Sequence, residues 1–166
     1  VYEGLVTPGI NMEILPQLAE SWVATSDDTW VFNLRRGVKF HDGSWLTAGD
    51  VAFSINRAKT APSDMVDLIK SVKSARAIDD HTVEIKTDGP NPILLNQLTQ
   101  IFVMSEAWSK ANGCEASYNW DAGETSYCAS NANGTGPFEI TFREQDVRTV
   151  FEKNDNWWGN HYTHNI

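Results

Sequence analysis

The stretch GVKFHDGSWLTAGDVAFSINR, residues 37–57, decides the fold that we predict for this chain. It runs from the end of a strand, through a turn at residues 41–43, into a helix. Thr47 is followed three residues later by Asp50, which resembles the capping box that begins many helices, with Asp in place of the usual Glu or Gln. We therefore expect a helix to begin directly after Thr47.

The predicted helix, residues 48–59, carries apolar side chains on two faces. At helical spacing Val51 and Ile55 fall on one face, whereas Phe53 points nearly the opposite way. A helix with apolar groups on two faces is normally covered on both sides. We therefore expect it to be a core element.

Alternating apolar residues outside this stretch predict antiparallel hairpins. The hairpins join residues 22–25 to 30–35, 72–78 to 82–87, and 138–143 to 148–152. Shorter elements are expected as a helix tail at 2–6, an extended piece at 10–15, a helical turn at 17–20, helices at 64–70, 93–99 and 105–111, a buried strand at 101–104 and a strand beginning at 166. Hairpins separated by helices predict an α+β fold with antiparallel sheets.

Length and charge limit the class of protein. A chain of 166 residues fits one domain or a part of something larger. The net charge of −9, from 22 acidic and 13 basic residues, argues against a nucleic-acid partner, which would require a basic surface. No apolar run is long enough to span a bilayer. The start at Val1, without a Met, indicates a mature or trimmed chain.

Two cysteines, Cys114 and Cys128, lie in a polar segment, residues 112–133, that we expect to be a loop. No His or second Cys pair stands at zinc spacing near them, which argues against a zinc site. A disulfide closing this loop would stabilise the fold by about 3 kcal/mol and imply an oxidising compartment. The alternative is a pair of free, buried thiols in a cytosolic protein.

Catalytic motifs are absent from the sequence. No glycine-rich phosphate loop opens a helix, and no Gly-x-Ser-x-Gly motif occurs. His41 beside Asp42 resembles a catalytic dyad, but neighbouring side chains in a turn diverge, so we expect these residues to shape the turn. His161 and His164 lie in a tail rich in Gly and Asn, where we expect no metal. Carboxylate pairs for glycoside chemistry stay open, because their separation cannot be read from a sequence.

Seven segments together carry a family resemblance. They are YEGLV (2–6), PQLAESW (16–22), WVFNLRRGVKFHDG (30–43), TAGDVAFS (47–54) with Arg57, DHTVE (80–84), GTGPF (134–138) and NDNWWG (154–159). Through them the chain resembles the N-terminal part of the extracytoplasmic solute-binding proteins of peptide and nickel ABC importers, called family 5. Each segment is a weak signal alone, but their order and spacing agree over nearly the whole chain.

The resemblance implies a partial structure. Members of this family are much longer and have the two-lobed, clamshell architecture of type II periplasmic binding proteins. Residues 1–166 would then be a single partial unit. Residues 20–133 would form the small domain peculiar to the family, residues 1–19 and 134–166 would belong to the first lobe, and the second lobe would be absent.

The resemblance also implies a function. The protein would capture a small solute, peptide-like or another small polar molecule, between two lobes and deliver it to a membrane ABC permease. It would be a monomer without enzyme activity or cofactor, and it would be periplasmic or extracytoplasmic, with a lipid anchor in a Gram-positive organism. The shared motifs are mainly structural, so they do not name the solute.

By analogy two places could face the ligand. One is the segment of Asn133, Gly134, Thr135 and Gly136, where bare glycines would let backbone groups approach a ligand. The other is the region of Asp64 and Met65, near the place where an oligopeptide-binding relative has an aromatic residue in the cleft. This sequence departs from that relative, because no aromatic residue occurs between Phe53 and Phe102. In both places a purely structural role is the alternative.

Two other functions remain open from the sequence. The many acidic residues and seven Trp suggest a secreted hydrolase or a carbohydrate-binding module. A third possibility is a lobe that docks on a sensor or permease without carrying a solute.

Overall fold

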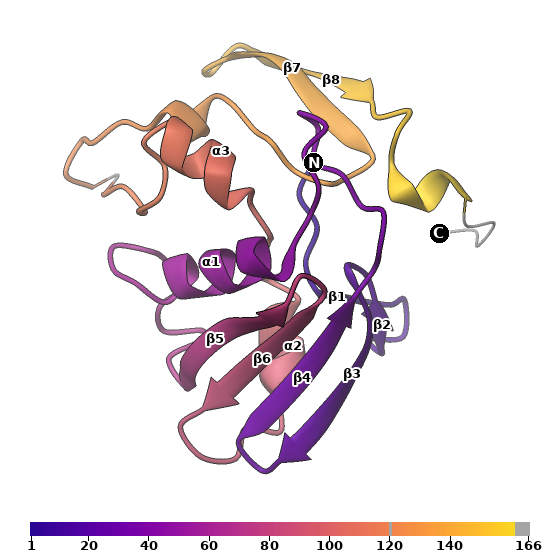
Figure 1. Ribbon diagram of the computed structural model, residues 1–166. Helices are drawn as coiled ribbons and strands as arrows, with labels where there is room; N and C mark the ends of the chain where they lie inside the picture. Colours follow the sequence, from indigo (N-terminus) through magenta and orange to yellow (C-terminus); the bar gives the residue numbers. More distant parts are fainter. Residues whose placement is uncertain (120, 162–166) are drawn as a thin grey trace.

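The computed structural model describes residues 1–119 and 121–161. A four-stranded antiparallel sheet forms the lower half of the molecule in Figure 1. Its strands are β3 (Ala19–Ser26), β4 (Thr29–Leu34), β5 (Val72–Asp79) and β6 (Thr82–Thr87), in the order β3-β4-β6-β5. The two predicted hairpins are confirmed. They join through β4 and β6, where Phe32 lies opposite Val83.

Helix α1 (Ala48–Ala58) begins where the sequence predicts. The Asp50 carboxylate accepts hydrogen bonds from the Thr47 backbone N–H at 2.9 Å and from its hydroxyl at 2.8 Å. These bonds satisfy a backbone donor that the helix itself leaves free. Val51 and Ile55 are buried in the core, α1 packs against β5 and β6, and Phe53 is half-buried.

Two shorter helices follow the sheet, as predicted. They are α2 (Leu94–Leu98), whose leucines enter the core, and α3 (Glu106–Ala111). The Ser105 hydroxyl caps α3 by accepting the Trp108 N–H at 3.2 Å. Residues 101–104 form one isolated bridge between Phe102 and Gly4 instead of a strand. None of the helices in the described part of the chain combines the length and apolar character that crossing a membrane requires.

Two small hairpins complete the fold. One joins β1 (Val6–Pro8) to β2 (Ile14–Pro16) and was not predicted. The other joins β7 (Phe138–Glu144) to β8 (Arg148–Lys153) and confirms the third predicted hairpin. The β7–β8 hairpin stands at the top of Figure 1, away from the four-stranded sheet. Two aromatic side chains of this hairpin, Phe138 and Phe151, are each about half exposed.

Three predicted helical segments are wrong. Residues 2–6 lead into a strand, because Gly4 bridges to Phe102 and Leu18 donates to the Gly4 carbonyl. Residues 17–20 lead into β3, because the backbone N–H groups of residues 17–19 donate to the carbonyls of Gly4 and Leu5. Residues 64–70 form successive turns, because so short a segment makes an unstable helix without extensive burial, and only Ile69 in it is fully buried. The strand predicted at residue 166 lies outside the described residues.

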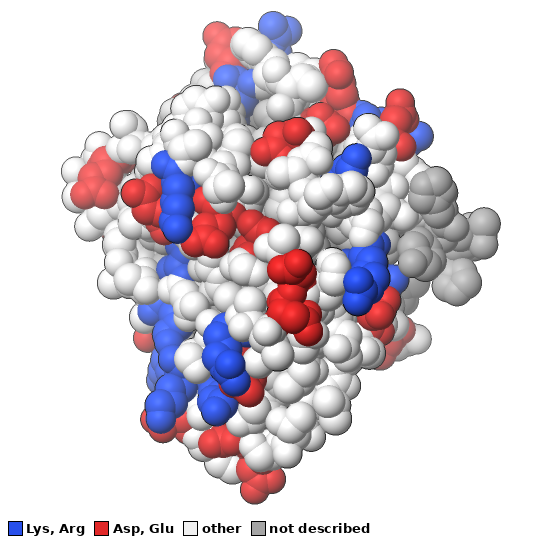
Figure 2. Space-filling model, viewed as in Figure 1, with Lys and Arg blue, Asp and Glu red and all other residues white. Residues whose placement is uncertain are grey.

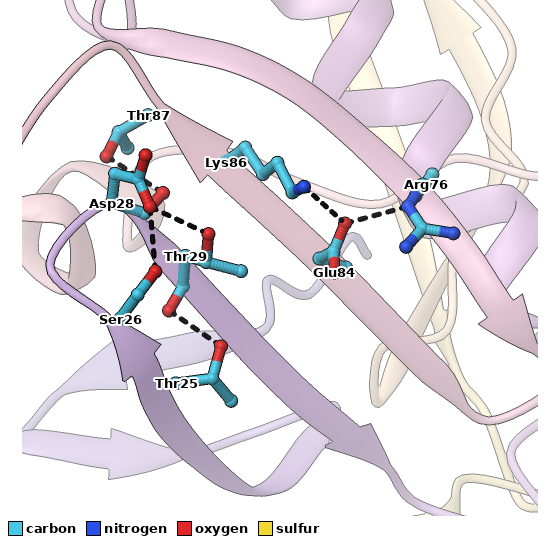
Figure 3. A network of polar contacts seen from close by, with 8 residues as sticks. All are labelled: Thr25, Ser26, Asp28, Thr29, Arg76, Glu84, Lys86 and Thr87. Carbon is cyan, nitrogen blue, oxygen red and sulfur yellow. Dashed lines mark hydrogen bonds and ion pairs between the residues drawn. The ribbon is translucent and has the colours of Figure 1, made fainter.

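Polar pairs cover the outer face of the sheet (Figure 3). The Glu84 carboxylate accepts a hydrogen bond from Arg76 at 2.7 Å and lies 3.7 Å from the Lys86 ammonium, and these contacts lower the pKa of Glu84. Asp28, at the β3–β4 turn, accepts hydroxyl hydrogen bonds from Ser26 and Thr29. Acidic and basic side chains both occur on the face seen in Figure 2, and basic side chains gather at its lower left.

Candidate functional site

The predicted segment at residues 133–136 lies against the turn that holds His41 and Asp42. The backbone N–H of His41 donates to the Gly134 carbonyl at 2.9 Å, and the backbone N–H of Gly134 donates to the ring nitrogen Nδ1 of His41 at 3.3 Å. His41 Nε2 lies 3.0 Å from the Gly136 carbonyl oxygen. Since a carbonyl can only accept, the neutral tautomer with the proton on Nε2 satisfies both ring contacts.

Asp42 and Asn133 form a reciprocal pair within the same contact. The Asp42 N–H donates to Asn133 Oδ1 at 3.1 Å, and Asn133 Nδ2 donates to Asp42 Oδ2 at 2.8 Å. Asp42 Oδ1 also accepts the N–H and hydroxyl of Ser44, at 2.9 and 2.6 Å, which shapes the turn. The predicted turn role of these residues is confirmed, and the structure adds a long-range role.

The two glycines of the segment receive the backbone of the chain's own first residue. The Gly136 N–H donates to the Val1 carbonyl at 2.7 Å. A Cβ on Gly134 or Gly136 would lie 2.3 or 2.6 Å from the Val1 oxygen, so neither position has room for a side chain. The close backbone approach expected from the glycines therefore exists, and here the approaching backbone is that of Val1.

The Glu3 carboxylate accepts three further hydrogen bonds in this region. Its side chain is buried, with 3% exposed. Oε2 accepts hydrogen bonds from the Thr135 hydroxyl and from Trp158 Nε1, both at 2.8 Å, and Oε1 accepts one from Trp157 Nε1 at 3.1 Å. Burial raises the pKa of Glu3, and these hydrogen bonds to the carboxylate oppose that rise.

We call this cluster the junction, because it brings together the first residues of the chain, the turn at residues 41–42, residues 133–136 and the pair Trp157–Trp158. It consists of Glu3, His41, Asp42, Asn133, Gly134, Thr135, Gly136, Trp157 and Trp158. The Arg35 guanidinium lies 4.6 Å from the centre of a Trp158 ring and covers it. The junction's carboxylates, imidazole and Asn133 amide all hydrogen-bond within the chain, so the geometry is that of a structural joint. The described residues hold no cluster of three His, Cys, Asp or Glu side chains that could bind a metal.

The second predicted place lies in the turns after α1. Asp64 is exposed, whereas Met65 is half-buried and packs on the core. No hydrogen bond among the described residues connects Asp64 or Met65 to the junction. Of the six predicted residues, Asp64 and Met65 present side-chain surface to solvent, whereas Asn133 and Thr135 are buried.

The predicted disulfide between Cys114 and Cys128 is confirmed, with an S–S distance of 2.10 Å. The loop that it closes is also fastened to α1. Arg57 donates from Nε to the Cys114 carbonyl at 3.0 Å and from Nη2 to the Ala116 carbonyl at 3.2 Å.

Reasoning from sequence missed Glu3 and the Trp157–Trp158 pair as members of the junction. The available signals were an acidic residue in an otherwise apolar N-terminal segment and two adjacent tryptophans. Neither signal indicates that Glu3 meets Trp157 and Trp158.

The chain is similar in sequence and in fold to several known proteins. The dipeptide-binding protein of Escherichia coli strain K12 is 29% identical over 89% of this chain. The structure of NikZ from Campylobacter jejuni in complex with Ni(L-His) matches 95% of the chain with a TM-score of 0.82 and 26% identity. The binding protein DppA of Helicobacter pylori, in complex with the peptide STSA, matches 96% with a TM-score of 0.77 and 25% identity.

These matches cover only part of each relative. The chain spans 30% of the Escherichia coli protein and 31% and 34% of the two solved chains. The family model described as bacterial extracellular solute-binding proteins, family 5 Middle, matches residues 13–165. The chain therefore belongs to the bacterial extracellular solute-binding proteins of family 5.

Proposed function

We propose that this chain is part of the substrate-binding component of an ABC importer, which captures a small solute outside the cytoplasm and delivers it to a membrane permease. The observation that carries the proposal is the family match over residues 13–165. The similar proteins named above are binding proteins, one for dipeptides, one solved with a peptide and one with Ni(L-His). They lend no support to a hydrolase or a carbohydrate-binding module.

The ligand class that we propose is a short peptide or a comparable small polar molecule, including a metal chelate of an amino acid. The whole protein would hold it between two lobes that close around it. Residues 1–19 and 134–166 would belong to the first lobe, and residues 20–133 would form the small domain. We also propose a monomer, with a lipid anchor where the source is Gram-positive.

Within this chain we propose different roles for the two predicted places. Asp64 and Met65 would contact the ligand directly, because their side chains reach the surface. Asn133, Gly134, Thr135 and Gly136 would act by setting the position of the backbone beside the ligand, because the side chains of Asn133 and Thr135 are buried and bonded within the chain.

Isothermal titration calorimetry tests this proposal. The 166-residue chain and a longer protein that includes the second lobe would each be titrated with di- and tripeptides, opines, sugars and Ni(L-His). We expect the longer protein to bind one class tightly and this chain to bind it at least about a hundredfold more weakly, because much of the contact surface is missing. Tight binding by this chain alone would contradict the two-lobe proposal.

Two further measurements separate the alternatives. A pull-down with the cognate permease, in the presence and absence of ligand, separates solute delivery from docking without a solute. Incubation with model glycosides and peptides tests for turnover, which a binding protein should not show.

A further inference from the structure

The imidazole of His41 connects two parts of the chain that the proposed function assigns to different units. His41 is bonded to Gly134 and Gly136 by its backbone N–H and by both of its ring nitrogens. In the division proposed above, His41 belongs to the small domain and the two glycines belong to the first lobe. The ring is half-buried, so protons from the solvent can reach it.

The two ring contacts require one protonation state. Nε2 lies 3.0 Å from the Gly136 carbonyl oxygen, which can only accept, so Nε2 carries a proton. Nδ1 lies 3.3 Å from the Gly134 nitrogen, whose N–H needs an acceptor, so Nδ1 carries none. The neutral imidazole with its proton on Nε2 therefore satisfies both contacts.

Proton uptake at Nδ1 breaks this match. The imidazolium has an N–H at both ring nitrogens, so its Nδ1–H would face the N–H of Gly134, a donor against a donor. Gly134 is buried, and a buried N–H without an acceptor costs free energy unless it moves to another partner. The bond from Nε2–H to the Gly136 carbonyl can persist. Protonation should therefore release Gly134 and leave Gly136 bonded.

The carboxylates nearest to this contact are engaged with other partners. Asp42 is held by Ser44 and Asn133, and Glu3 is held by the Thr135 hydroxyl and the two indole N–H groups. No hydrogen bond among the described residues joins either carboxylate to the His41 ring. The imidazolium would therefore find no ready acceptor for its Nδ1–H.

The N-terminal segment adds further titratable groups beside the two glycines. Tyr2 and the Val1 amino group lie against Gly134 and Gly136. Burial raises the pKa of Tyr2, so this phenol stays neutral where imidazole titrates. Burial lowers the pKa of the Val1 amino group and raises that of Glu3. A test of His41 must therefore separate its proton from those of Val1 and Glu3.

We propose that His41 is a pH-sensitive switch between the turn at residues 41–42 and residues 133–136. The neutral ring fastens Gly134, and the imidazolium releases it. This switch does not depend on the importer function. Its consequence, a weaker affinity for ligand at acidic pH, rests on the proposed function, in which residues 133–136 set the position of the backbone beside the ligand.

An NMR titration of the 166-residue chain from about pH 8 to about pH 5 tests the switch, because imidazole takes up its proton in this range. At the basic end we expect the ring-nitrogen signals of the tautomer with the proton on Nε2. On acidification the Gly134 amide signal should move with the same midpoint as the His41 ring signals. The opposite neutral tautomer, or a Gly134 signal that does not follow the ring, would overturn the proposal.

His41→Asn separates His41 from the other titrating groups. The Asn amide oxygen can replace Nδ1 as an acceptor but takes up no proton, so the Gly134 signal should keep its high-pH position, with circular dichroism to verify the fold. His81→Asn, a change in the turn between β5 and β6, should leave the Gly134 titration as in the native chain. A Gly134 titration that persists in His41→Asn would assign it to Glu3 or Val1 and refute the switch.

Calorimetry on a longer protein that includes the second lobe tests the consequence, with alanyl-alanine as the probe. We expect its affinity to fall about fivefold or more between about pH 7.5 and pH 5.5, and to stay constant in His41→Asn. An equal fall in both proteins would overturn the effect on binding. Failure to bind this dipeptide at any pH would count against the proposed function, whereas the NMR titration would still decide the switch.

Discussion

Single atoms decide much of the junction, and Gly134 is the clearest case. A Cβ at this position would lie 2.3 Å from the Val1 carbonyl oxygen, which is backbone and cannot rotate away. We expect Gly134→Ala to destabilise the protein by about 1–3 kcal/mol, as overpacking does elsewhere. Urea denaturation measures this loss. Ser130→Ala, an exposed change on the same segment, should stay within about 0.5 kcal/mol, and equal stability of both variants would contradict the predicted clash.

The reciprocal pair of Asn133 and Asp42 predicts a second effect at this scale. Asn133→Asp keeps the shape of the side chain, but it removes the Nδ2 group that donates to Asp42 Oδ2 and puts a second carboxylate in its place. We expect a loss of about 1–3 kcal/mol near neutral pH. The like charges raise the folded-state pKa values of the pair, so the loss should shrink as the pH falls and the pair takes up a proton.

The control for this substitution is Asn96→Asp in α2, where the side chain is exposed and makes no hydrogen bond among those of the described residues. That variant should show little change in unfolding free energy at any pH tested. A constant deficit of Asn133→Asp across pH would rule out charge repulsion as its cause.

At the scale of elements, the disulfide and Arg57 hold the loop at residues 112–133 against α1. Replacing both cysteines, Cys114→Ala with Cys128→Ala, should lower the unfolding free energy by about 3 kcal/mol, because the unfolded chain loses a constraint over a loop of this length. Chemical denaturation with and without a reductant measures the effect. The reductant should destabilise the native chain and leave the double variant unchanged, and a reductant effect on both would invalidate this account.

The elements also show which local signals can be read from a sequence. The start of α1, both hairpins of the large sheet and the cap of α3 depend on residues a few positions apart, and all were predicted. The helices predicted at 2–6, 17–20 and 64–70 were wrong. Short segments carry weak helical patterns, and distant backbone partners, such as the Gly4 carbonyl for Leu18, decided two of them.

At the scale of the whole molecule, Glu3 connects the N-terminal segment to Thr135, Trp157 and Trp158. Because burial raises the pKa of Glu3, the folded state keeps its proton to a higher pH than the unfolded state does. Stability from this group should therefore fall as the pH rises from the ordinary glutamate pKa through the raised one. Glu3→Gln cannot ionise and should lose this pH dependence.

Urea denaturation of the native chain and of Glu3→Gln over about pH 4 to 8 measures the difference. We expect Glu3→Gln to be less stable at the acidic end, because the amide presents a donor to one of the indole N–H groups. Glu152→Gln, an exposed change, should keep the native pH profile. Identical slopes for the native chain and Glu3→Gln would show that Glu3 does not titrate in this way.

We predict that the β7–β8 hairpin opens more readily than the four-stranded sheet. Among the described residues the hairpin's two strands pair with each other alone, and Phe138, Phe142 and Phe151 are about half exposed, whereas β4 and β6 each have a strand on both sides. We expect the amides of β7 and β8 to exchange with deuterium much faster than those of β4 and β6. Amide exchange followed by NMR measures this, and equal protection of the hairpin and the sheet would contradict the prediction.

The candidate site shows the same limit as the fold. The importance of residues 133–136 and of the turn at His41 and Asp42 could each be suspected from the sequence, but their contact could not. The two segments are more than ninety residues apart, and nothing in either segment specifies the other. The same holds for Glu3 and Trp158, whose hydrogen bond spans nearly the full chain.

The sequence by itself determined the α+β class, the helix after Thr47, the three hairpins of β3–β4, β5–β6 and β7–β8, and the family, while it left the disulfide open against a pair of free thiols. These depend on local spacing, caps and alternation, or on motifs that can be matched one segment at a time. Only the tertiary structure decided that the stretch at residues 37–57, through its turn, holds residues 133–136 in place, and that Val1 occupies the approach that the glycines leave open. Such contacts depend on which distant groups the folded chain brings together, where a buried donor or acceptor must find its partner.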